Sequence, residues 1–309
     1  MRDSPQSIAV YVCTYKRNDA LRNMLEALTK AAERVSDRAQ VAAIVVDDNV
    51  DGRASVVVDE FTGRFELGIH YRHSGQQNIS LARNLGLEAG IDLADWVAMT
   101  DDDCEPDAEW LSALLDTLEA TGADALTGPL ILRFPYDSPG WLSEEPFAIG
   151  ENEIYDDRAP MPLAQTHNSI ISAAWLRKHP DVRFDPDLGR LGGEDMIFYR
   201  TAVEAGLRIN YARHAVVHEV VPPARANLRY QLRTQYWLGN SEYVTNTQSG
   251  MATPLRMVLR AGRRGTDAVV RPFARMSRRE SPQWRWCVAT VLRSIGMAIG
   301  IFGIRIDHR

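Results

Sequence analysis

The chain has 309 residues, of which 45% are hydrophobic and 25% charged, and its formal net charge is -6. This length and composition predict a soluble globular protein with one large or two ordinary domains, and the acidic balance argues against a dedicated nucleic-acid binder. Three cysteines without metal-ligand spacing, and a first apolar run that begins at Ile8 with no signal peptide before it, indicate a cytoplasmic protein.

The first half of the sequence alternates short apolar runs with amphipathic segments. Buried strands are expected at 8–14, 41–46 and 69–72 and from Trp96 onward, and helices at 18–35, 54–61 and 81–89, the last closed by Gly90. This alternation predicts parallel βαβ units and therefore an α/β fold. No Gly-x-Gly-x-x-Gly follows the first strand, so a dinucleotide-binding fold is not indicated.

The second half mixes helical and strand patterns with one long irregular segment. Helices are expected at 107–121, 196–205 and 228–243, and strands at 123–132, 167–173 and 209–221. Residues 134–162 show no period, and loops of this length are usually lids or binding loops, so acceptor contacts are expected there and near Asn168.

The tail differs in charge from the rest of the chain. Residues 251–309 hold twelve arginines, no lysine and three acidic residues, which gives this tail about +9 and the remainder about -15. It carries two basic segments, 255–264 and 268–279, and an apolar segment at 284–304. Residues 287–304 reach only about the lower limit of length for a membrane span and contain Arg293, so a single span is not expected. We expect 255–304 either to contact an anionic membrane or to pack as a helical hairpin or an oligomer contact.

One stretch concentrates the acidic chemistry. From Trp96 an apolar run leads directly into Asp101, Asp102 and Asp103. Like charges held side by side at the end of a buried strand repel one another, and the usual remedy is a bound divalent cation. The alternative is a solvated acidic turn before the next helix. Cys104 follows the three aspartates and is assigned no chemistry, since neighbouring carboxylates raise a thiol pKa.

Further acidic groups follow other predicted strands and turns. Asp47 and Asp48 end the second strand, where they either bind a nucleotide or serve turn chemistry before Gly52. Glu194 and Asp195 follow two glycines at a helix start, where a carboxylate serves either as a general base or as a partner of the helix dipole. His218 and His214 are spaced to face the same side of a strand, and a lone strand histidine is usually structural.

Six motifs follow one another along the chain: Thr14-Tyr15, Val46-Asp47-Asp48-Asn49, Asn78-x-x-x-x-Arg83-Asn84-x-Gly86, Thr100 to Pro106, the 124–132 strand and Gly192-Gly193-Glu194-Asp195. In this order they resemble the motifs of a family 2 glycosyltransferase. The resemblance covers residues 8–243. One departure stands out, because the Gln-x-x-Arg-Trp motif of the family's processive synthases does not fit the spacing from Gln231 to Trp237. Transfer of a single sugar is therefore expected.

The resemblance implies a GT-A fold with a single, mostly parallel central sheet flanked by helices. The catalytic domain would span residues 1–225, with a donor half at about 1–105 and an acceptor half at about 106–225. Residues 226–309 would form a basic, partly amphipathic helical extension. The implied activity is inverting transfer of a sugar from a nucleotide-diphosphate donor, with a UDP-sugar favoured, to a hydroxyl of a glycan or lipid-linked acceptor.

The resemblance also assigns roles to residues. Asp195 would be the catalytic base, with Glu194 as its rival. Mn²⁺ or Mg²⁺ would be bound directly by Asp103, indirectly by Asp101, and by His218 as a third ligand that some members use. The remaining donor-binding residues would be Thr14, Tyr15, Asp47, Asp48 and Arg83, joined by Asp101. Two alternatives stay open, a sugar-1-phosphate nucleotidylyltransferase and a non-catalytic subunit of a glycan-assembly complex. The place of action would be the cytoplasm, at the inner face of the plasma membrane.

Overall fold

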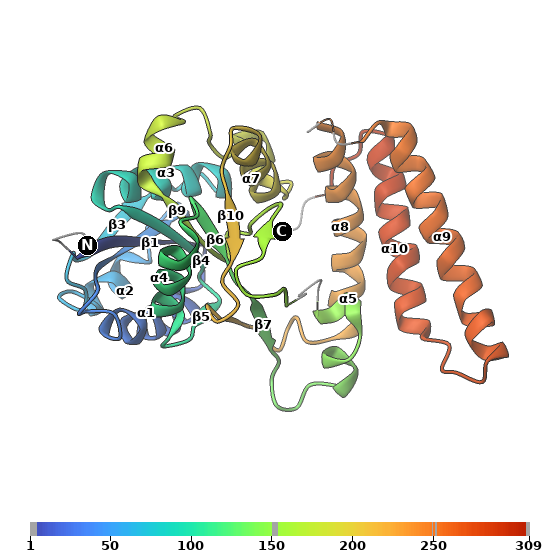
Figure 1. Cartoon of the computed structure of the whole chain (residues 1–309). Helices are drawn as coiled ribbons and strands as arrows, with labels where there is room; N and C mark the ends of the chain where they lie inside the picture. Colours follow the sequence, from blue (N-terminus) through green and yellow to red (C-terminus); the bar gives the residue numbers. More distant parts are fainter. Residues whose placement is uncertain (1–4, 150–153, 249, 251, 307–309) are drawn as a thin grey trace. The chain divides into compact units, whose positions relative to one another are not determined.

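The computed structural model describes residues 5–149, 154–248, 250 and 252–306. These residues form two compact units (Figure 1). The first lies within 1–133, 152–189 and 194–220. The second combines residues 221–309 with two segments from the middle of the chain, 134–151 and 190–193. Part of the expected acceptor loop, 134–162, therefore belongs to the second unit.

The first unit is built on an eight-stranded mixed sheet with the order β3-β2-β1-β4-β9-β6-β10-β8. Its strands are β1 (Gln6–Thr14), β2 (Ala39–Asp47), β3 (Ile69–His73), β4 (Trp96–Asp101), β6 (Ala125–Thr127), β8 (Pro160–Met161), β9 (Asn168–Ser172) and β10 (Ile209–Tyr211). The strands β3, β2, β1 and β4 are parallel to one another, and β9 is antiparallel to both β4 and β6. The mostly parallel α/β sheet expected from the sequence is confirmed.

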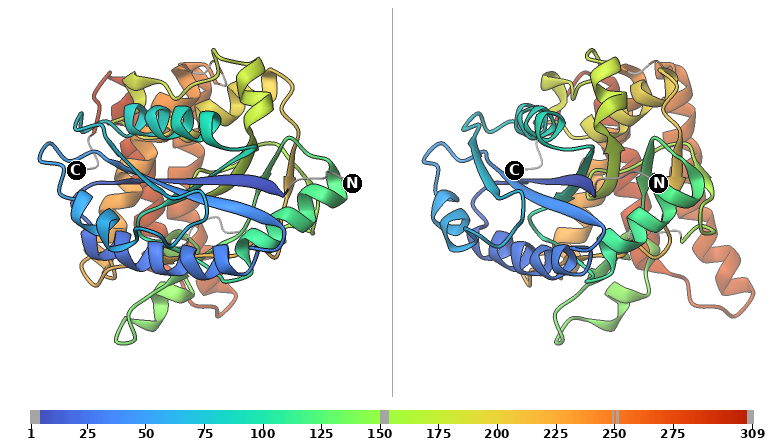
Figure 2. Two further views of the ribbon diagram at one scale, coloured as in Figure 1. Left: turned by 90° about the vertical axis from the view of Figure 1, so that its left-hand side faces the viewer. Right: turned by 60° about the vertical axis from the view of Figure 1, so that its left-hand side comes forward.

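Helices cover both faces of this sheet, as Figure 2 shows for α1 and α3. On one face lie α1 (Asn18–Glu33), α2 (Ser55–Glu60) and α4 (Trp110–Thr121), packed on Ile8, Val10 and Val12. On the other lie α3 (Ile79–Leu93), α6 (Ala173–Lys178) and α7 (Glu194–Glu204), packed on Ala9, Tyr11 and Cys13. Because side chains alternate along β1, this continuous apolar run feeds two separate cores.

A second, three-stranded sheet has the order β5-β11-β7, and the sequence did not indicate it. Its strands are β5 (Cys104–Pro106), β7 (Leu130–Arg133) and β11 (Val217–Val220). The expected single strands at 123–132 and 209–221 are wrong, because each breaks in two and sends its second half into this small sheet. The break at 212–216 also means that His214 and His218 do not share one strand.

The side chain of Asn168 connects the two segments at which strands pass from the large sheet to the small one. Its side chain is fully buried and donates to the carbonyls of Pro129 and Ala215, at 2.9 and 2.7 Å, one in each broken segment. Its Oδ1 accepts a bond from the Trp110 indole at 2.9 Å. The buried Asn168 amide therefore makes three hydrogen bonds within the protein and supports the structure. The expectation of acceptor contacts near Asn168 stays a prediction.

The two asparagines of the motif on α3, Asn78 and Asn84, form hydrogen bonds with backbone groups. Asn78 caps the helix by accepting from the amides of Ser80 and Leu81, and Asn84 forms two hydrogen bonds with the backbone of Phe184. The helix continues through Gly90 to Leu93, so the expected end at Gly90 is wrong. Gly90 packs against Val97, where a β-carbon would lie 2.8 Å from a methyl group, so this glycine allows close packing of α3 on β4.

The second unit is helical. Helices α8 (Leu228–Gln248), α9 (Pro254–Ser277) and α10 (Trp284–Ile301) lie side by side, accompanied by α5 (Pro146–Ile149) and the short 3₁₀ turn Gly140–Ser143 (Figure 1). The two basic segments expected at 255–264 and 268–279 are therefore one helix, α9. Within the described residues, no helix has both the length and the apolar character that crossing a membrane requires.

Candidate active site

The ends of three parallel strands bring the predicted acidic groups to one edge of the large sheet. Thr14 at the end of β1 pairs in register with Asp47 at the end of β2, and Cys13 pairs with Asp101 at the end of β4. In open α/β sheets, ligands bind at the carboxyl ends of the strands. The register alone therefore places the first two acidic clusters beside one another.

Asp47 and Asp48 differ in how much of each carboxylate is already engaged. The buried Asp47 accepts from the amides of Asn49 and Ala54, at 2.9 and 2.7 Å, and from the Tyr71 hydroxyl at 3.1 Å. Asp48 accepts from Ser74 and Gln76 through one oxygen only. Asp47 thus organises the loop after β2, which matches the turn alternative raised from the sequence.

The three consecutive aspartates have different surroundings. Asp102 is buried and accepts from Thr14 Oγ1 at 2.8 Å, and burial raises the pKa of its carboxyl to about 6 although Arg17 opposes the shift. Arg17 bridges Asp102 and Asp103, with its Nη1 at 2.9 and 2.7 Å from the two carboxylates. Asp102 therefore holds the loop after β1 in place.

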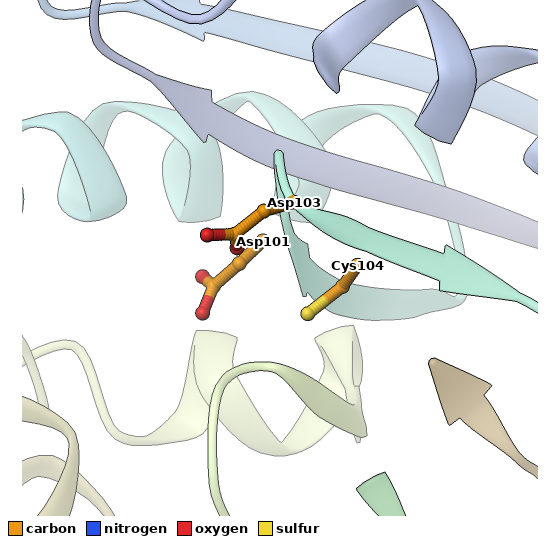
Figure 3. A group of neighbouring side chains, drawn as sticks. All are labelled: Asp101, Asp103 and Cys104. Carbon is orange, nitrogen blue, oxygen red and sulfur yellow. The ribbon is translucent and has the colours of Figure 1, made fainter. Parts of the chain in front are cut away.

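Asp101 and Asp103 form the group suited to a cation. Figure 3 shows their carboxylates side by side at the turn between β4 and β5, with Cys104 next to them. One ligand atom from each of these three residues lies within 4.8 Å of the other two. Burial raises the pKa of the Cys104 thiol well above its usual value, and the carboxylates add to the effect, so the sulfur is a neutral thiol. The oxygen donors of Asp101 and Asp103 match a hard divalent cation such as Mg²⁺ or Mn²⁺, and the thiol does not.

Arg83 links this turn to the start of α7. Its guanidinium is buried, forms an ion pair with Glu194, and lies 3.4 Å from Asp101. Burial raises the pKa of Glu194, and the charge of Arg83 opposes the shift. Asp195 is half-buried and accepts the amide of Met196 at 2.7 Å. Among the described residues, Asp195 forms no ion pair, although its charge helps to raise the pKa of Arg83. The carboxylate of Asp195 is therefore less engaged than that of Glu194.

The two glycines before Glu194 serve the packing of the second unit. Gly192 and Gly193 have φ angles of +83° and +88°, which other residues rarely adopt. Trp237 packs against Gly192 and Thr245 against Gly193, all within the second unit. A side chain at either position would meet these neighbours, so both the backbone conformation and the close contact require glycine.

His218 is placed apart from the aspartate pair. On β11 it lies opposite Glu105, and its Nε2 lies 2.9 Å from Asp107. The next residue, Glu219, lies opposite Cys104 and adds to the rise in the pKa of that thiol. Because side chains alternate along a strand, Glu219 rather than His218 is on the side of the aspartates. The metal role of His218 stays a prediction.

Sequence reasoning missed Arg17 and His167. The position of Arg17 in the first loop was visible, but nothing local indicated that it would reach residues 85 and 86 positions away. His167 precedes β9, and burial lowers its pKa while the charges of Asp101, Asp195 and Asp103 oppose the shift. The side chain of His167 is therefore close enough to these three carboxylates to interact with their charges. No pattern in the sequence indicated this.

Backbone strain marks the same region. Lys16 and Gln77 have φ angles of 58° and 52°, a left-handed conformation that is uncommon for residues other than glycine. Between them the Tyr15 hydroxyl donates to Gln77 Oε1 at 3.3 Å. Such strain collects at binding sites, where the surrounding structure holds it. The loops after β1 and β3 thus frame the edge that bears the acidic groups.

Known proteins are similar in sequence to most of this chain. The succinoglycan biosynthesis protein ExoM of Rhizobium meliloti is 29% identical over 312 residues, which cover 96% of this chain and 94% of that protein. The glucosyl-dolichyl phosphate glucuronosyltransferase of Haloferax volcanii is 23% identical over 252 residues, which cover 77% of this chain and 76% of that protein.

Solved structures of S. aureus TarS share the fold. TarS 1–349 superposes with a TM-score of 0.55 at 14% identity, over 96% of this chain and 92% of that one. Its complex with UDP-GlcNAc gives 0.54 at 14% identity, over 76% of this chain and 66% of that one. The model of the family described as glycosyl transferase family 2 matches residues 9–181, more than half of the sequence. The chain therefore belongs to glycosyl transferase family 2.

Proposed function

We propose that this glycosyltransferase moves one sugar, with inversion, from a UDP-sugar to a hydroxyl group of a glycan or lipid-linked acceptor in polysaccharide biosynthesis. The similarity to ExoM supports the biosynthetic setting, and the TarS complexes with UDP-GlcNAc and UDP support the donor class. In the reaction the acceptor oxygen bonds to the anomeric carbon while the bond from that carbon to the diphosphate breaks. The nucleoside diphosphate leaves, and the acceptor proton goes to a carboxylate.

The proton acceptor in this proposal is Asp195. The observation that carries it is the ion pair of Glu194 with the buried Arg83, which engages the rival carboxylate, whereas Asp195 feels the charge of Arg83 but forms no ion pair among the described residues. A general base must be ionised and within reach of the acceptor hydroxyl. Asp195 stands on the rigid first turn of α7 and is half-buried, so it has the freedom that Glu194 lacks.

A divalent cation, Mn²⁺ or Mg²⁺, would be held by Asp103 and Asp101. Bound there, it would supply positive charge for the departing diphosphate. The two carboxylates offer the oxygen donors that such an ion prefers. The ion would share Asp103 with Arg17 and Asp101 with Arg83.

The nucleoside would lie against the loops after β1 and β2. Asp48 keeps one carboxylate oxygen without a described partner and is our preferred contact for the base, with Thr14 and Tyr15 beside it. Asp47 supports that loop through its three hydrogen bonds. Residues 255–304 would bring the enzyme to an anionic membrane on the cytoplasmic side, where a lipid-linked acceptor is found.

The test compares Asp195→Asn with Glu194→Gln and with Asp187→Asn, an exposed aspartate nearby as the matched control. Thermal shifts with UDP-, GDP- and dTDP-sugars and Mn²⁺ first identify the donor. We expect Asp195→Asn to lower transfer by about 10²- to 10⁴-fold while UDP binding is unchanged, and Asp187→Asn to transfer normally.

Unchanged transfer by Asp195→Asn would remove the proposed base. Formation of a nucleotide-sugar from a sugar 1-phosphate and UTP would instead identify a nucleotidylyltransferase, which the glycine-free loop 14–19 disfavours. Wild-type protein that binds no nucleotide and releases no UDP with any donor would indicate a non-catalytic subunit.

A further inference from the structure

Helix α9 exposes two groups of large apolar side chains, one in its first turns and one in its second half. At about 100° per residue the two groups fall on the same side of the helix, although residues 260–268 between them hold no large apolar side chain. The side chains are 55% to 67% exposed, and the residues are Leu255, Leu259, Val269, Val270, Phe273 and Met276. We call this face the stripe, and so many large apolar side chains exposed on one side of a helix indicate an interaction surface.

The stripe is not the face by which α9 packs in its own unit. Met257 and Ala261 are buried in a cluster with Met297 of α10 and Tyr243 of α8, and Ala268 is buried as well. At about 100° per residue these buried positions lie on the side of the helix opposite the stripe. The helix therefore has a satisfied inner face and a separate apolar face without a described partner.

Arginines border this apolar face. The helix contains six arginines and a single acid, Asp267. Arg260 and Arg264 turn to Glu242 on α8, and Arg271 lies over the Trp286 ring. Within the described part of the chain, Arg256 and Arg263 have no ion-pair partner, and neither does Arg278 at the end of the helix. An excess of guanidinium groups beside an apolar stripe requires an occupant that offers both anionic groups and hydrocarbon.

We infer that α9 lies flat in the interface of an anionic membrane, with the stripe among the acyl chains and the free arginines on lipid phosphates. A helix of this length spans about 36 Å, and guanidinium groups bind phosphate oxygens in a bidentate manner. A second copy of the chain fits less well, because pairing two such faces brings arginines against arginines. This inference rests on the membrane contact proposed above and names the face that makes it.

The test measures co-sedimentation of the full chain with vesicles of phosphatidylcholine alone or with 30% phosphatidylglycerol, a composition chosen on the order of natural anionic fractions. Two variants address the two parts of the surface: Leu259→Gln with Phe273→Gln for the stripe, and Arg256→Gln with Arg263→Gln for the charge. Val56→Gln, an exposed valine on α2, and Arg72→Gln, an exposed arginine on β3, are the matched controls.

We expect wild type and controls to bind the anionic vesicles, and each double variant to lose at least about tenfold in binding. Higher salt should weaken wild-type binding. Equal binding by wild type and the stripe variant would overturn the inference. So would a wild type that ignores vesicles but forms dimers in the ultracentrifuge that the stripe variant abolishes. Helical circular dichroism verifies folding, and UDP release in solution, measured on the same samples, reports separately on the proposed transfer chemistry.

Discussion

In each compact unit one ion is paired with several ions of the opposite sign, and the sign of that ion differs between the two units. In the first, the cation Arg83 is surrounded by the carboxylates of Asp101 and Glu194. In the second, the carboxylate of Glu242 is surrounded by Arg260, Arg264 and Arg293. A buried arginine thus binds two carboxylates in the first unit, and a half-buried glutamate binds three arginines in the second.

Each unit also has an excess of one sign of charge. In the first, the three carboxylates of Asp101, Asp102 and Asp103 outnumber the two arginines that contact them, Arg17 and Arg83. In the second, Arg256 and Arg263 of α9 have no ion-pair partner among the described residues. Because an uncompensated charge attracts a counter-ion, the first unit is suited to a metal ion and a donor phosphate, and the second to an anionic surface. The same physical rule thus directs two regions to different ligands.

The largest expected effect comes from removing the buried cation of the first unit. Arg83→Met leaves Glu194 buried without a partner, which should destabilise the fold by about 3–5 kcal/mol in urea denaturation. The double variant Arg83→Met with Glu194→Gln removes both charges and should recover part of that loss. Equal destabilisation by the single and double variants would show that the ion pair does not stabilise the contact between α3 and the start of α7.

A smaller effect is expected for the anion of the second unit. Burial alone would raise the pKa of Glu242, but its arginines outweigh burial and hold that pKa below the usual 4.5. A lowered pKa gives stability that is present above the unfolded value and lost as the pH falls through the folded value. Glu242→Gln should therefore cost about 2 kcal/mol at pH 7, and the difference from wild type should shrink below about pH 4. Urea midpoints across this pH range provide the measurement, and a difference that ignores pH would contradict this account.

The smallest expected effect on stability comes from replacing Arg17, which pairs with Asp102 and Asp103. Arg17 is 39% exposed, so Arg17→Gln should cost about 1 kcal/mol or less. It leaves Asp103 with less positive charge, so Mn²⁺ should raise the melting temperature more in this variant than in wild type. Asp103→Asn is the matched variant, and it should respond least to Mn²⁺. An identical response by all three proteins would show that Mn²⁺ binds elsewhere.

Local patterns predicted most elements of the first unit and the acidic groups at their ends. The apolar runs at 8–14 and 41–46 became β1 and β2, because such short continuous runs favour a strand buried on both faces. The spacing of leucines predicted α1. The family motifs pointed to Arg83, Asp101 and Asp103, and the structure brings Arg83 to Asp101. The charge asymmetry of the tail also predicted a basic helix, although not that it would be continuous.

What the sequence determined by itself is most elements of the parallel part of the sheet and the identity of the acidic groups, since both follow from side-chain type and spacing over a few residues. The tertiary structure alone decided which carboxylate meets which arginine. Arg83 reaches Glu194 across 111 positions, and this contact separates Glu194 from Asp195 although they are neighbours in the chain. It also decided that the strands near Asn168 break to form a second sheet, because long-range hydrogen bonds, which no local pattern encodes, fix where a strand ends.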